Sequence, residues 1–352
     1  MFHERQREFG RTLTAIQLHQ QGHHGWSLLH QALDDLLSTK DAIFCRLLNA
    51  VWAARPDISD AHLVTLIGAA VRQIAQRERE TAVLFDSSRD VATRLDILRQ
   101  LVMQNEAELG KQICGRSNSF TGARRFLAPQ LIIGGFAAEH QIDEVRFLDL
   151  GTGLGILPRQ LNNEVVYNRF AKDLVWDPWE PEYRVIPLTV RYGVDAPPLP
   201  NMDWVRACYG PSRYYEERFQ ELMWSFEQTA GVESDVLIRE LDMLDLPRLA
   251  DFILTNQFNV VTCNFALFQY AQSVQEAVER CVVQNMASPG LFLTMNPSHA
   301  LLRPGCQVRG RLVGNTSELQ LADASDAHLI GTIIAGTDLP FIIGQRKRAG
   351  SE

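Results

Sequence analysis

The stretch Val145–Gly155, VRFLDLGTGLG, decides the fold of this chain. Its first six residues form a short, mostly apolar run that ends at glycines, as a buried parallel strand does. The glycines at alternate positions let the following turn adopt positive φ and let a ligand approach the bare backbone. We therefore predict a strand, a turn whose free N–H groups meet a polar ligand, and a helix, in that order.

The rest of the C-terminal half repeats this alternation. Further apolar runs occur at Leu188–Asp195, Asp235–Glu240, Asn259–Cys263 and Gly290–Met295, and helical patterns occur at Asp203–Gln228, Asp245–Thr255 and Ala271–Met286. Such an order is typical of a parallel sheet with helices on both faces. After Pro304, we predict antiparallel strands at Val308–Val313, His328–Ala335 and Phe341–Gln345. Residues 128–352 are thus expected to form an α/β, Rossmann-like, mostly parallel seven-stranded sheet. An aromatic insertion at about 164–187 is read as a loop or hairpin near the pocket mouth.

Residues 1–127 show helical periodicity instead. Leu28–Leu37 and Ala42–Ala53 are predicted as helices, and Ser59 is the predicted N-cap of a third helix. A fourth helix is expected to start at Ser87, with Asp90 near the position of a capping box. We expect this α-helical subdomain to serve as a lid over the site or as a dimerisation surface.

Composition limits the possible partners and compartments. The 352 residues carry a formal net charge of −8, which argues against broad binding to nucleic acid. No apolar segment is long enough to span a bilayer, and the N-terminal residues lack the apolar core of a signal peptide. Six cysteines without CxxC spacing are typical of free thiols. We expect a cytoplasmic protein with no membrane partner, no nucleic-acid partner and no metal.

The pattern Asp149-x-Gly151-x-Gly153-x-Gly155 resembles the first motif of class I S-adenosylmethionine-dependent methyltransferases. The turn lacks the last glycine of the dinucleotide-binding G-x-G-x-x-G pattern, because Ile156 follows Gly155. The resemblance implies that Asp149 orders the loop and the methionine part of S-adenosyl-L-methionine. It also implies that Gly151, Thr152 and Gly153 line this cofactor, whose product would be S-adenosyl-L-homocysteine.

The same resemblance implies acidic residues at the next strand ends. Asp195 is the candidate that binds the ribose hydroxyls, although it lies well beyond the usual spacing of about 20 residues. Glu164 and Asp173 compete for this role. Asp242 and Met243 match the pair that meets the adenine, and Asp242 could instead cap the following helix.

The fourth strand of the family pattern ends at Asn264 and Phe265, where the resemblance implies contact with the methyl group and the acceptor. Asn264 could orient an acceptor through its carbonyl oxygen, or it could be an ordinary strand-end cap. His299 follows the fifth strand and is the best candidate for a general base, because imidazole titrates near neutrality. A solvent-exposed loop histidine is the alternative.

The order of elements in residues 100–300 also resembles an uncharacterised bacterial family of methyltransferase-like domains. The shared features are an Asn-containing segment before the first strand, Ser117–Arg124, the aromatic insertion, and a strand that ends Gly193-Val194-Asp195. This layout implies that Asn118 and Arg124 pass near the carboxylate of the cofactor, where an arginine would be useful. A solvated loop is the alternative.

Together these features predict methyl transfer from S-adenosylmethionine to a small-molecule acceptor, with an amine slightly favoured, by direct displacement. Positioning would supply much of the rate, because the sulfonium is already an activated donor. Three alternatives stay open: transfer of the aminocarboxypropyl group, a nicotinamide oxidoreductase, and a non-catalytic regulator that binds adenosylmethionine. The helical half could also form a homodimer.

Overall fold

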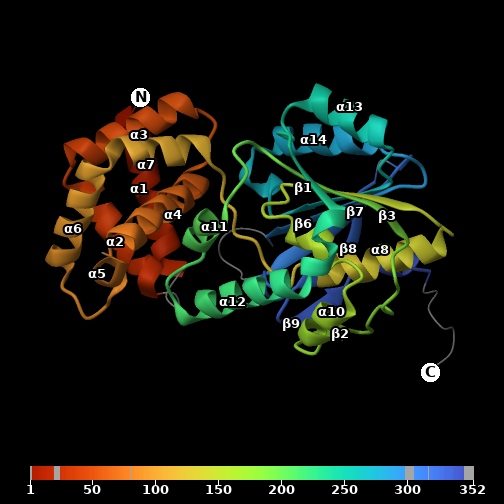
Figure 1. Ribbon diagram of the computed structural model, residues 1–352. Helices are drawn as coiled ribbons and strands as arrows, with labels where there is room; N and C mark the ends of the chain where they lie inside the picture. Colours follow the sequence, from red (N-terminus) through yellow and green to blue (C-terminus); the bar gives the residue numbers. More distant parts are fainter. Residues whose placement is uncertain (1, 20–23, 80, 298–304, 316, 345–352) are drawn as a thin grey trace. The chain divides into compact units, whose positions relative to one another are not determined.

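The computed structural model describes residues 2–19, 24–79, 81–297, 305–315 and 317–344 (Figure 1). The chain forms two compact units. The first comprises Met1–Thr121 and Pro200–Gln220, and the second comprises Gly122–Leu199 and Glu221–Glu352. The predicted division at residue 127 placed residues 200–220 in the second unit, whereas they belong to the first.

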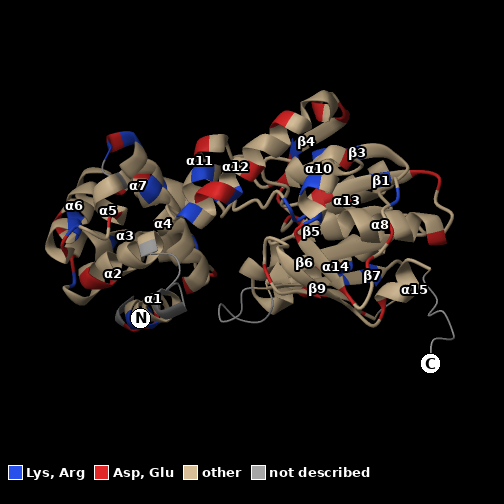
Figure 2. Cartoon of the chain, turned by 90° about the horizontal axis from the view of Figure 1, so that it is seen from below, with Lys and Arg blue, Asp and Glu red and all other residues tan. Residues whose placement is uncertain are grey.

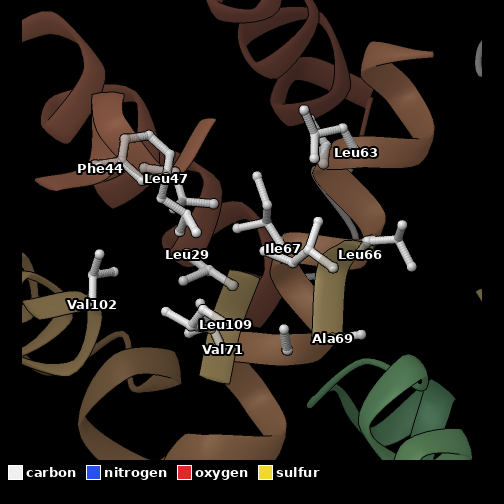
Figure 3. Packing of buried hydrophobic residues seen from close by; sticks show 14 of the residues in the cluster. Leu29, Phe44, Leu47, Leu63, Leu66, Ile67, Ala69, Val71, Val102 and Leu109 are labelled. Atoms are coloured by element: carbon white, nitrogen blue, oxygen red, sulfur yellow. The ribbon is translucent and has the colours of Figure 1, made fainter. Parts of the chain in front are cut away.

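The first unit is helical. It contains α1 (Phe2–His19), α2 (His24–Ser38), α3 (Ala42–Ala54), α4 (Asp60–Glu78), α5 (Thr81–Phe85), α6 (Val91–Gln104), α7 (Glu106–Gly115), α11 (Met202–Cys208) and the start of α12 (Arg213–Gln228). Leucine, isoleucine and phenylalanine side chains meet in its core, among them Leu29, Phe44 and Leu66, which are 0% exposed (Figure 3). Each such burial stabilises the unit by roughly 1.5–3 kcal/mol.

Capping residues set the ends of two of these helices. The Ser59 hydroxyl accepts a hydrogen bond from the His62 N–H at 3.2 Å, which confirms the predicted N-cap of α4. Asp90 caps α6 in the same way, because its carboxylate accepts from the Thr93 N–H at 2.8 Å. The predicted start at Ser87 is therefore wrong, since the capping carboxylate stands directly before Val91.

The second unit is built on one sheet, which has nine strands in the described residues: β1 (Val145–Leu150), β2 (Leu174–Asp177), β3 (Leu188–Asp195), β4 (Val236–Glu240), β5 (Val260–Asn264), β6 (Leu291–Pro297), β7 (Cys306–Leu312), β8 (Leu319–Ala324) and β9 (Gly331–Ala335). Their order is β2-β9-β8-β7-β6-β5-β1-β3-β4. Neighbours among β6, β5, β1, β3 and β4 pair in parallel, and β6 to β9 pair antiparallel. The Rossmann-like α/β prediction is confirmed.

The predicted count of seven strands is wrong. Strand β2 lies inside the aromatic insertion and pairs in parallel with β9 at the far edge of the sheet, so the insertion is not simply a loop or hairpin. Strand β8 was not expected. The segment predicted as a strand at Phe341–Gln345 instead begins in helix α15 (Leu339–Ile342), where Pro340 occupies the first turn.

Helices cover both faces of the sheet. Helices α13 (Leu246–Asn256) and α14 (Gln272–Asn285) lie on one face, and α8 (Leu127–Glu139) and α10 (Glu164–Ala171) lie on the other (Figure 1). The first pair shares an apolar cluster with Val261 and Phe292. The helix predicted at Asp203–Gln228 is divided into α11 and α12, because Gly210-Pro211 interrupts it.

Acidic and basic residues are interspersed along the helices (Figure 2). All six cysteines are free. Among the described helices, none combines the length and the apolar character needed to cross a bilayer.

Candidate functional site

The strand order of the sheet reverses at β1. Apart from β2 at the far edge, the next strands in the sequence, β3 and β4, lie on one side of β1, and β5 and β6 lie on the other side. In open α/β sheets, ligands bind outside the carboxyl ends of the strands at such a switch point. The residues that follow β1, β3, β4 and β5 at this edge are therefore the candidate site.

The glycine turn after β1 has the expected backbone but not the expected free N–H groups. Gly151, Gly153 and Gly155 have φ of +66°, +59° and +70°, which only glycine adopts readily. The Thr152 N–H donates to the Val194 carbonyl at 3.0 Å, and the Gly155 N–H donates to the Thr152 carbonyl at 2.9 Å. The Gly153 N–H donates to Asp195 Oδ2 at 2.8 Å. These three groups are already bonded within the protein.

Two glycines of the turn also pack tightly. A Cβ at Gly151 would lie 2.5 Å from the Cβ of Ala266, which follows β5. A Cβ at Gly155 would collide with Ile238 of β4. The short helix α9 (Ile156–Gln160) then begins directly after Gly155. These contacts hold the turn against the ends of its neighbouring strands, which explains the glycine at each position.

Asp149 stands at the end of β1 and is only 4% exposed. The Thr262 hydroxyl of β5 donates to Asp149 Oδ1 at 2.6 Å. Burial raises the pKa of the Asp149 carboxyl to about 7, and the nearby charge of Asp195 acts in the same direction. The hydroxyl donors oppose this shift because they stabilise the ionised form. Asp149 thus joins the end of β1 to β5 beneath the turn, and its role in ordering a cofactor stays a prediction.

Asp195 ends β3, next to β1, and its position explains the long sequence spacing. After α9, the insertion crosses to the far edge of the sheet and forms β2 there. The chain then returns to form β3 beside β1. Asp195 Oδ1 accepts from the Ala196 N–H at 2.8 Å while Oδ2 accepts from Gly153. Burial raises the pKa of Asp195, and the charge of Asp242 adds to the rise.

The two competing ribose candidates lie elsewhere. Asp173 forms an ion pair with Arg124 Nη1 at 2.9 Å, just before β2. Glu164 begins α10, where its charge adds to the burial that raises the pKa of Tyr183. The geometry therefore favours Asp195 as the acid that belongs to the glycine turn.

The residues after β4 lie beside this acid. The Leu241 N–H donates to the Asp195 carbonyl at 2.9 Å, which joins the two strand ends. Asp242 Oδ1 accepts from the Leu244 N–H at 2.9 Å, whereas Asp245 is the N-cap of α13. Asp242 is thus not the helix cap. Met243 is buried, and its Cε lies 3.6 Å from a Cβ built on Gly151.

The end of β5 differs from the turn in the side-chain amide of Asn264. Asn264 Nδ2 and Oδ1 are both buried, and neither has a hydrogen-bond partner among the described residues. A buried amide left unpaired costs about 1–3 kcal/mol per group. Phe265 has φ +54°, a conformation that bulky residues rarely adopt. Strain of this kind, at roughly 1–3 kcal/mol, is typical of ligand sites.

Arg125 is a site residue that the sequence reasoning missed by one position. Its guanidinium carbon lies 3.6 Å from the ring centroid of Phe265, and its Nε donates to the Ala327 carbonyl at 3.0 Å. The predicted residue, Arg124, instead makes two hydrogen bonds to Glu221, at 2.7 and 3.0 Å, besides its ion pair with Asp173. The prediction that Arg124 holds a ligand carboxylate is not supported by this geometry.

Two further predicted residues are not placed relative to the site. His299 lies outside the described residues, so its role as a base stays a prediction. Asn118 belongs to the first unit, and its Oδ1 is buried without a partner in the described part of the chain. Its approach to a cofactor also stays a prediction.

No protein-family description matches the chain, and no curated protein matches it either. Solved structures give matches of low similarity. CalS10, described as an amino pentose methyltransferase from Micromonospora echinaspora and solved with S-adenosylmethionine, is 15% identical over 54% of this chain and 63% of its own, with a TM-score of 0.27. DhpI, in complex with S-adenosylhomocysteine, is 13% identical over 74% of this chain and 79% of its own, with a TM-score of 0.28.

YjhP from E. coli is 16% identical, with a TM-score of 0.24, over 46% of this chain and 48% of its own. The match thus spans less than two thirds of CalS10 and about half of YjhP. The strand order and the parallel pairing of β6, β5, β1, β3 and β4 identify the Rossmann-like fold of this chain.

Proposed function

We propose that the second unit binds S-adenosyl-L-methionine at the carboxyl edge of the sheet and transfers its methyl group to a small-molecule acceptor. The observation that carries the proposal is the hydrogen bond from the Gly153 N–H to Asp195 Oδ2. A turn that binds a pyrophosphate needs free N–H groups. In this turn, three N–H groups already donate to acceptors within the protein, and the Asp195 carboxylate occupies the position that a phosphate would approach.

The same carboxylate suits a ribose. Each oxygen of Asp195 accepts one backbone hydrogen bond and keeps a lone pair for a ribose hydroxyl. The buried Met243 would contact the adenine, and Gly151 to Gly153 would line the thioether chain. The buried amide of Asn264 has no partner in the described part of the chain, and a ligand would satisfy it. The donor set therefore fits an adenosyl ligand, which would supply an activated methyl group.

The chain's own residues would act by positioning. Asn264 Oδ1 can accept from an N–H or O–H of the acceptor and so orient its lone pair along the line of displacement. An amide is not a base, which favours an acceptor that is nucleophilic when neutral, such as an amine. A role of the helical unit as a lid or a homodimer surface is part of the same proposal.

Calorimetric titration of the purified chain with S-adenosylmethionine, S-adenosylhomocysteine and NADH tests the cofactor assignment. We expect saturable binding of the two adenosyl ligands, loss of both in a Gly153→Arg variant, and no binding of NADH. Binding of NADH alone would contradict the proposal.

Product analysis then separates the two transfer reactions. Incubation with adenosylmethionine labelled either on the methyl group or in the aminocarboxypropyl arm, together with a panel of small amines, should yield product labelled only from the methyl group. Binding without any turnover over the panel would favour a regulatory protein.

A further inference from the structure

We propose that Arg125 is a positioning residue for the acceptor side of the site, because its stack on Phe265 fixes the direction of the Asn264 amide. This inference rests on the proposed function, since it assigns a role within the same ligand site. It concerns a residue that neither the motif nor the spacing of the sequence indicates.

Arg125 is held in place from two sides. It is 6% exposed and lies two residues before the first residue of α8. Its backbone N–H donates to the Gly122 carbonyl at 3.2 Å, and its Nε donates to the carbonyl of Ala327, in the turn between β8 and β9. The guanidinium therefore has a fixed position over the ring of Phe265. A desolvated guanidinium over an aromatic ring is a favourable contact.

Phe265 needs such a contact to keep its conformation. Its φ of +54° is unfavourable for a bulky side chain, and strained residues persist only where their surroundings hold them. The Phe265 N–H donates to the Met295 carbonyl at 2.7 Å, which holds the backbone on one side. The Arg125 stack holds the ring on the other side.

The direction of the Asn264 amide depends on this arrangement. No described residue makes a hydrogen bond to the amide, so the backbone at Asn264 and Phe265 sets where it points. The next residue, Ala266, packs against the glycine turn at Gly151. A change at Phe265 would thus turn the amide while the glycine turn stays in place.

The chemistry of the side chain makes the proposal specific to arginine. A planar guanidinium can lie flat on a ring and still donate from its edge to a carbonyl, whereas an ammonium cannot do both. An Arg125→Lys substitution therefore keeps the charge and removes the geometry.

Two ligands report on the amide without knowledge of the acceptor. S-adenosylhomocysteine has no group where the methyl would stand, whereas sinefungin has a carbon in place of the sulfur and carries on it an amino group at the methyl position, which can donate to Asn264 Oδ1. We expect the wild-type chain to bind sinefungin more tightly than S-adenosylhomocysteine in calorimetry. Arg125→Lys and Asn264→Ala should each lower this preference about tenfold, as the loss of one hydrogen bond to a charged group does. The affinity for S-adenosylhomocysteine should stay nearly unchanged.

Arg169→Lys is the matched control, because Arg169 stacks on Trp224 at 4.1 Å in another part of the same unit. It should leave the preference intact. In a Phe265→Gly background, where positive φ carries no strain, a further Arg125→Lys change should have no additional effect on the preference.

The outcomes distinguish a failure of the role proposed for Arg125 from a failure of the proposed function. If Arg125→Lys keeps the wild-type preference, or weakens both ligands equally, Arg125 does not position the amide and the inference is overturned. If the wild-type chain binds neither ligand, the proposed function fails and this inference fails with it.

Discussion

The ends of β1 and β5 lie side by side in the sheet, yet they differ in one physical respect. At the end of β1, the glycine turn bonds three of its N–H groups within the protein, and Asp149 has the Thr262 hydroxyl as donor. At the end of β5, the Asn264 amide is unpaired among the described residues and Phe265 is strained. We call the end of β1 the finished end, because its polar groups are paired within the protein, and the end of β5 the unfinished end, because the proposed ligand would pair the Asn264 amide.

The largest effect should follow from breaking the finished end. A Gly151→Val substitution forces a side chain into a positive-φ position and against the Cβ of Ala266. We expect it to abolish binding of S-adenosylhomocysteine and to lower the free energy of unfolding by about 3 kcal/mol. Calorimetry and urea denaturation measure the two effects. A Gly231→Ala change, where an added Cβ would meet nothing within 4 Å, is the control that should alter neither.

Asp195→Ala tests the link between the turn and the ribose. The substitution leaves the Gly153 N–H without its acceptor and removes both carboxylate oxygens. We expect binding of S-adenosylhomocysteine to weaken about a hundredfold, at about 1.4 kcal/mol for each factor of ten. The matched variant Asp173→Ala, at the competing position, should bind the ligand as the wild-type chain does. Equal losses in the two variants would argue against Asp195 as the ribose acid.

Asp149, at the end of β1, should make the free energy of unfolding depend on pH. Its folded pKa is raised to about 7 from an ordinary value of 3.8, so the folded state holds a proton that the unfolded state has lost. The stability that this proton provides is present below about pH 4 and is lost as pH rises to about 7. Asp149→Asn removes the titration. The stability of the variant relative to wild type should therefore rise by about 1.4 kcal/mol for each pH unit between about pH 4 and 7, and stay level above about pH 7.

Urea denaturation of both chains over this pH range measures the difference. Asp195 also has a raised pKa and titrates in both chains, so the difference between the chains reports the titration of Asp149 together with its coupling to Asp195. A difference that is independent of pH would mean that Asp149 is ionised throughout the range.

The smallest effect should come from filling the unfinished end. Asn264→Leu puts an apolar group of similar size in place of a buried amide that has no partner among the described residues. We expect the free protein to gain about 1 kcal/mol in its free energy of unfolding, while it loses its preference for sinefungin. Asn256→Leu is a suitable control, because the Asn256 amide already donates to the Phe252 carbonyl at 2.8 Å. That change should give no comparable gain.

The sequence predicted the finished end better than the unfinished one. The apolar run before Asp149, the alternate glycines and the cap at Ser59 each depend on local backbone physics, so short patterns reveal them. The pairing of Asp195 with the turn depends on sheet order, which the long insertion hides. Strand β2 has four residues and gains its partner β9 from more than a hundred residues away. The residues around β2 give no local signal of such a distant pairing.

Arg125 illustrates the same limit at the scale of one residue. Arg124 and Arg125 are adjacent and chemically identical, and only packing decides which of them meets Glu221 and which meets Phe265. A sequence argument can place an arginine before α8, but it cannot choose between neighbours whose side chains point in different directions. The unpaired amide of Asn264 is likewise visible only after the surrounding backbone is known.

A crystal structure of the chain grown with S-adenosylhomocysteine tests the central claim most directly. The account predicts ribose hydroxyls on Asp195, the adenine beside Met243, and the sulfur beside the end of β5, with the Gly153 N–H still bonded to Asp195. An adenosyl ligand bound away from these strand ends, or a turn that has opened its N–H groups to a phosphate, would contradict the account.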